Sequence, residues 1–76
     1  MNLTDQLLKL AIEAAKNQLR EKFPNIPVAL LLDYAPVLVE LSAKLLNKFS
    51  DPIQTELEFR ALYALIEEKM KELGVK

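Results

Sequence analysis

The sequence contains no cysteine, no histidine and no tryptophan, and its single glycine is Gly74. Without cysteine the chain can form no disulfide, no thiolate metal site and no cysteine nucleophile. Without histidine it lacks the commonest general base and the commonest ligand of transition metals. A phosphate-binding loop needs several glycines, and one glycine cannot supply them. These absences predict a protein that is not an enzyme and that binds neither a metal ion nor another cofactor.

Blocks of charge of one sign are also missing. The chain has 10 basic and 11 acidic side chains, a net charge of -1, and the two signs are interspersed. Because nucleic-acid binding depends on a basic surface, we expect no nucleic-acid partner. No basic region precedes an apolar run at the N-terminus, so we expect no signal peptide and a cytoplasmic location.

The longest apolar stretch, residues 26–46, has the length of a membrane span. It nevertheless contains Asp33, Glu40, Lys44 and two prolines, and charged side chains are costly at the centre of a bilayer. The sequence therefore predicts no membrane span.

Hydrophobic residues make up 51% of the chain, and their spacing is helical. In residues 3–22 one apolar stripe recurs at intervals of three and four residues, at Leu8, Ile12, Ala15, Leu19 and then Phe23. A second stripe of Leu3, Leu7, Leu10 and Ala14 lies beside it at the N-terminal end. We expect this end of the helix to contact two neighbours at once.

The central stretch allows two interpretations. Either a helix over residues 26–34 ends and a new one, capped by Asp33, follows over residues 35–48, or a single helix is kinked at Pro36. In both cases apolar residues surround most of the helix circumference, which predicts a helix enclosed by its neighbours.

The last predicted helix covers residues 52–73. Asp51, Pro52 and Gln54 form a typical helix start, with an acidic cap, proline in the first turn and an amide at the third position. Gly74 stands where a left-handed cap ends a helix, and Val75 can fold back toward Met70. The whole chain, residues 1–76, is therefore predicted to be one all-α domain, a compact antiparallel bundle of three to four helices.

Apolar residues outside the main helix faces form a candidate interaction surface. They combine the N-terminal stripe with a second stripe of the last helix: Leu3, Leu7, Leu10, Ile53, Leu57, Ala61, Ala64 and Leu65. The alternative is that both stripes are buried inside one bundle. If they are exposed, the partner would be a second copy of the chain or another protein.

Candidate catalytic groups are weak. Ser42 has no histidine to activate it, and Lys44, two residues on, points elsewhere on a helix. Asp33 and Glu40 share a helix face about 10 Å apart along the axis, and we expect both to be exposed.

The function predicted from these features is that of a non-catalytic structural or interaction module. Helix caps, apolar pattern and local preference agree almost everywhere, which is typical of a designed helical bundle without natural activity. One alternative is a small natural protein, of phage or bacterial origin, that self-associates or docks a partner through an apolar helix face. Another is a carrier that holds a small apolar ligand between its helices.

Overall fold

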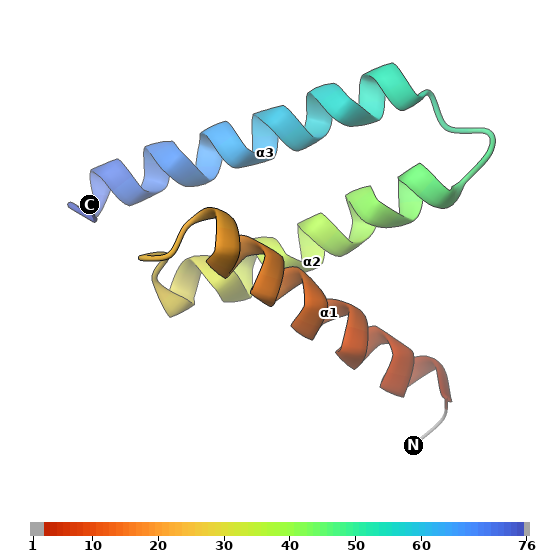
Figure 1. The fold of residues 1–76 in the computed structure, drawn as a ribbon, viewed down its shortest axis with the longest axis horizontal. Helices are drawn as coiled ribbons and strands as arrows, with labels where there is room; N and C mark the ends of the chain where they lie inside the picture. Colours follow the sequence, from red (N-terminus) through yellow and green to blue (C-terminus); the bar gives the residue numbers. More distant parts are fainter. Residues whose placement is uncertain (1–2, 76) are drawn as a thin grey trace.

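The computed structural model describes residues 3–75, which form three helices. Helix α1 covers Leu3–Lys22, α2 covers Val28–Leu46 and α3 covers Pro52–Glu72. Within the described residues the structure contains no strand. The all-α prediction is confirmed, and Figure 1 shows α2 between the other two helices.

The central stretch forms one helix that continues through Pro36. Proline has no N–H, so the carbonyl of Leu32 receives no helical hydrogen bond from it. The helix persists because residues on both sides of the proline, Leu31 and Leu38 among them, are buried in the same core. It begins at Val28, after Pro27 in an extended conformation, and not at residue 26. The alternative with a new helix starting near Asp33 is not formed.

Both ends of α3 follow the sequence prediction. The Asp51 carboxylate accepts hydrogen bonds from the amides of Ile53, at 2.9 Å, and Gln54, at 3.4 Å. Gly74 adopts a φ of 75°, and the Val75 amide donates to the Met70 carbonyl at 2.9 Å. This is the bond that closes a Schellman motif, and it brings Val75 against the core.

Replacing Asp51 by alanine is expected to lower the free energy of unfolding by about 1 kcal/mol, because two amides of the first turn lose their acceptor. Urea denaturation monitored by circular dichroism measures the change. Asp51→Ser keeps an acceptor oxygen and should retain most of the stability. An equal loss in both variants would show that the cap does not account for the effect.

Helix α2 is the common neighbour of the other two helices. α3 runs antiparallel along it, while α1 crosses it at a wide angle (Figure 1). Over residues 3–75, no Cα atom of α1 comes within 8 Å of one in α3. Side chains bridge this distance: the Gln18 amide donates to the Tyr63 hydroxyl at 3.1 Å, and the ring of Phe23, the residue after α1, lies 6.1 Å from that of Tyr63.

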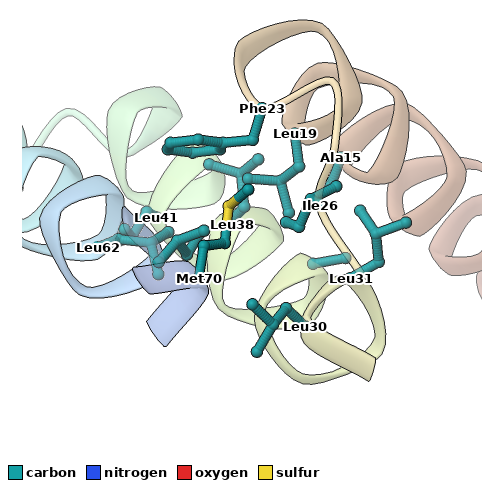
Figure 2. Close-up of a cluster of buried hydrophobic side chains, with 12 residues drawn as sticks. Ala15, Leu19, Phe23, Ile26, Leu30, Leu31, Leu38, Leu41, Leu62 and Met70 are labelled. Carbon is teal, nitrogen blue, oxygen red and sulfur yellow. The ribbon is translucent and has the colours of Figure 1, made fainter. Parts of the chain in front are cut away.

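The core lies where α1 crosses α2 and where α3 runs beside it. Leu19, Leu38 and Ile66, one from each helix, are fully buried. Figure 2 shows Leu38 with Leu19 and Phe23 on one side and Met70 on the other. Ala35 is also fully buried, as a close helix approach at this small residue requires.

The molecule is flat and open for its size. Its extents are 38 × 34 × 16 Å, and its radius of gyration is 13.4 Å, compared with about 11.4 Å for a typical domain of this length. Its accessible surface is 5691 Å², whereas a folded monomer of the same mass exposes about 4,700 Å². The single core therefore leaves an unusual amount of surface uncovered.

Candidate interaction surface

The N-terminal half of α1 carries an uncovered apolar stripe. Leu3, Leu7 and Leu10 are all exposed, with Leu10 at 67%. They lie about 130° around the helix axis from Ala15 and Leu19, which face the core. The sequence predicts two neighbours for this end of the helix, but α2 is its only helix neighbour within the described chain. The prediction of a second neighbour inside the chain is therefore wrong.

The second apolar stripe of α3 is also exposed. Ile53, at 73%, and Leu57, at 53%, lie on the side of α3 opposite the buried Thr55 and Leu62. The rest of this stripe is exposed as well, at Ala61, Ala64 and Leu65. Residues on one side of it carry charge, and the Arg60 guanidinium lies 2.9 Å from the Glu56 carboxylate.

The structure does not bring the two stripes together into one surface. α2 separates the N-terminal half of α1 from α3 (Figure 1), and the backbones of α1 and α3 stay apart. The eight predicted residues therefore form two surfaces. We name Leu3, Leu7, Leu10 and Ala14 the α1 stripe, and Ile53, Leu57, Ala61, Ala64 and Leu65 the α3 stripe. Their binding to a partner stays a prediction.

The prediction that the central helix is enclosed by its neighbours is wrong for much of its length. Val28, Leu32 and Leu45 are exposed, and Leu46 is 89% exposed. For Leu45 and Leu46 the cause is the crossing of α1, whose N-terminal half diverges from the C-terminal half of α2 (Figure 1). α3 covers only one other side. The periodicity of one helix does not determine the angle at which another helix crosses it. It therefore cannot show which part of α2 is left uncovered by its neighbours.

A groove lies between the middle of α1 and the C-terminal half of α2. It has a volume of about 300 Å³, and no charged residue lines it. Most of its lining is small or apolar: Ala11, Ala14, Ala15, Gln18, Val39, Ser42, Ala43 and Leu46. The α1 stripe borders this groove through Ala14. Together they form a continuous apolar area, which we call the α1–α2 face.

A second groove of about 640 Å³ lies between α2 and α3. It shares Gln18 and Ser42 with the first groove, and it also contains Leu45, Phe59 and Tyr63. The hydrogen bond between Gln18 and Tyr63 spans the place where α1 meets α3. The Lys44 ammonium, 3.0 Å from the Glu58 carboxylate, joins α2 to α3 outside this groove.

The sequence alone did not predict that α2 contributes exposed apolar residues to the α1–α2 face. The signal was present, since Val28, Leu32, Val39, Ala43 and Leu46 recur at a helical spacing beside the buried stripe. Two adjacent apolar stripes on one helix predict that neighbouring helices cover most of its circumference. In this fold Val39 packs against the core, whereas Val28, Leu32, Ala43 and Leu46 are exposed.

Chemical groups that could form a reactive centre are dispersed. Asp33 and Glu40 are exposed, as predicted, and Ser42 borders the two grooves. Among residues 3–75 no group of three potential metal ligands comes together. In the same part of the chain every buried polar side-chain atom has a hydrogen-bond partner. None of the three helices, as far as they are described, has the length and apolarity required to cross a membrane.

No protein-family model, no curated protein and no solved structure matches the chain. We therefore infer its function from its surfaces.

Proposed function

We propose that this chain is a non-catalytic interaction module that binds a protein partner through apolar helix surfaces. The observation that carries the proposal is the uncovered α1–α2 face, where the α1 stripe has exposed leucines and borders an uncharged groove through Ala14. Large contiguous apolar areas are rare on monomeric proteins and mark interaction sites. A partner helix laid on such an area buries side chains at three- and four-residue spacing.

The size of the exposed surface supports the same proposal. The excess over a typical monomer of this mass is roughly 1,000 Å². A standard protein interface removes about 800 Å² from each partner. One partner of ordinary size would therefore bring the chain to the exposure expected of a folded protein.

A double substitution in the α1 stripe tests the proposal. Leu7→Gln with Leu10→Gln should lower the free energy of unfolding of the monomer by less than about 1 kcal/mol, because both side chains are largely exposed. The double variant should nevertheless lose association and should bind less of a solvatochromic dye in the native state. Urea denaturation, light scattering and dye fluorescence provide the three measurements.

The control lies on the same helix. Leu19→Gln introduces the same polar group at a fully buried position, so it should unfold the chain or destabilise it severely. If the double variant unfolds to a similar extent, the α1 stripe belongs to a core and the proposal is wrong.

A carrier of a small apolar ligand is a second candidate, and the uncharged 300 Å³ groove favours it. The groove volume is at the lower end for small-molecule sites, which bury most of their ligand. However, its lining includes Leu46, which is 89% exposed, so a small ligand would remain partly in water. Saturable one-to-one binding of an apolar dye by the monomer would support the carrier.

The exposed leucines also bear on the origin of the chain. Designers of monomeric bundles avoid large exposed apolar areas. If the chain was designed, its exposed leucines therefore indicate that it was designed to assemble and not to remain a monomer. A natural protein that binds a partner would carry the same surface. A cytoplasmic location is part of the proposal and rests on the sequence.

A further inference from the structure

We infer that the partner on the α1–α2 face is a second copy of this chain, held by a two-fold symmetric contact between the two copies of α1. This inference rests on the proposed function and identifies its partner. In a two-fold contact the same area of each copy meets itself, so that area must be self-complementary in shape and charge.

The shape of the α1–α2 face satisfies this requirement. Leu7 and Leu10 project from α1 as a ridge of exposed side chains. Beside the ridge, Ala11, Ala14 and Ala43 line the groove and leave space for larger side chains of another molecule. When two copies face each other, the leucines of each α1 can enter the groove of the other.

An antiparallel arrangement of the two α1 helices matches their stripes in length. With Leu7 opposite Leu10 of the second copy, Leu3 comes opposite Ala14, so each large residue at the end of the stripe meets a small one. The ridge of one helix then packs between the side chains of the other, which is the general geometry of helix pairs. This arrangement supplies the second neighbour that the N-terminal half of α1 lacks within the described chain.

The distribution of charge permits self-contact. A charged side chain near a two-fold axis faces its own copy at short range, and the resulting repulsion weakens such a contact. No charged residue lines the α1–α2 groove. Lys9 and Glu13 lie roughly 90° or more around α1 from the stripe. A second copy therefore brings no like charge into the centre of the interface.

The exposed area is also of the correct size for one further copy. The chain exposes roughly 1,000 Å² more than a monomer of its mass, and each chain of a standard dimer buries about 800 Å². Helix α3 lies on the other side of α2 from the N-terminal half of α1 (Figure 1), so the α3 stripe stays outside this contact. It is consequently an internal control.

Single cysteines test the inference, because the chain has none of its own. Ala14→Cys places a thiol at the edge of the α1–α2 groove, and Ala61→Cys places one on the α3 stripe; both alanines are exposed. The rate of alkylation of each thiol is measured over a range of protein concentrations, with light scattering on the same samples. The same variants in urea give the rate for an uncovered thiol.

We expect the mass to rise from 8.7 kDa to twice that value as concentration increases. Over the same range alkylation of the Ala14→Cys thiol should become at least about tenfold slower. This is the decrease expected when about nine chains in ten are dimeric and their thiols are buried in the interface. The Ala61→Cys thiol should keep its rate. Protection of the Ala61→Cys thiol in place of the Ala14→Cys thiol would overturn the inference.

A mass of 8.7 kDa at every concentration would overturn the second copy as partner. If the Ala14→Cys thiol then reacts at the rate found in urea, the face is open and the proposed interaction with a different protein still holds. If instead that thiol is protected in the monomer at all concentrations, the face is covered within the chain, and the proposed function fails as well.

Discussion

Leu38→Ala is expected to lower the free energy of unfolding by about 3 kcal/mol, since the substitution removes a buried side chain and leaves a cavity. Leu38 is fully buried and belongs to a cluster of buried side chains from all three helices, as Figure 2 shows. A domain of this length has a total stability of about 4–11 kcal/mol. The loss should therefore remove between about a quarter and three quarters of the total stability.

Urea denaturation followed by circular dichroism measures this loss, and Leu32→Ala is the control. Leu32 lies on the same helix but is 57% exposed, so its truncation should cost about 1 kcal/mol or less. Equal losses at the two positions would show that α2 is not packed between α1 and α3 at Leu38.

The second prediction concerns a substitution that should stabilise the protein. Pro36→Ala is expected to raise the free energy of unfolding by about 1–2 kcal/mol, because alanine restores the hydrogen bond to the Leu32 carbonyl and removes the clash of the proline ring with it. The gain is reduced by the greater freedom that alanine allows in the unfolded chain. Pro36 is exposed, so the substitution removes little packing.

Pro52→Ala is the matched control for Pro36→Ala. Pro52 is the first residue of α3, where an N–H has no partner within the helix. Its replacement should leave stability unchanged or slightly reduced. If Pro36→Ala is no more stable than the parent chain, the proline is required for the path of α2 between its neighbours, and tertiary contacts offset its local cost.

Much of the fold could be predicted from the sequence because its signals are local. The start of α3 follows from an acidic cap and a first-turn proline, and its end from a single glycine with positive φ. The packed stripe of α1 through Ala15 and Leu19 follows from spacing alone. Each of these features depends on residues within about one helical turn, so the amino-acid order contains the necessary information.

The path of α2 through Pro36 could not be predicted, because two effects of similar size oppose one another. The proline and Asp33 favour a new helix locally, whereas burial of Leu31 and Leu38 in one core favours a continuous helix. Only the tertiary arrangement shows which of these effects is larger.

The candidate site shows the same division. The sequence by itself determined that the chain is helical, that it lacks the groups of common catalytic and metal sites, and that α1 and α3 each carry a second apolar stripe. Tertiary structure decided which apolar residues are covered. The crossing of α1 over α2 leaves Leu10 and Leu46 exposed, and a groove lies between the two helices. Which residues are covered depends on the angles at which the helices cross. These angles arise from the packing of whole helices against one another and not from the apolar periodicity of a single helix.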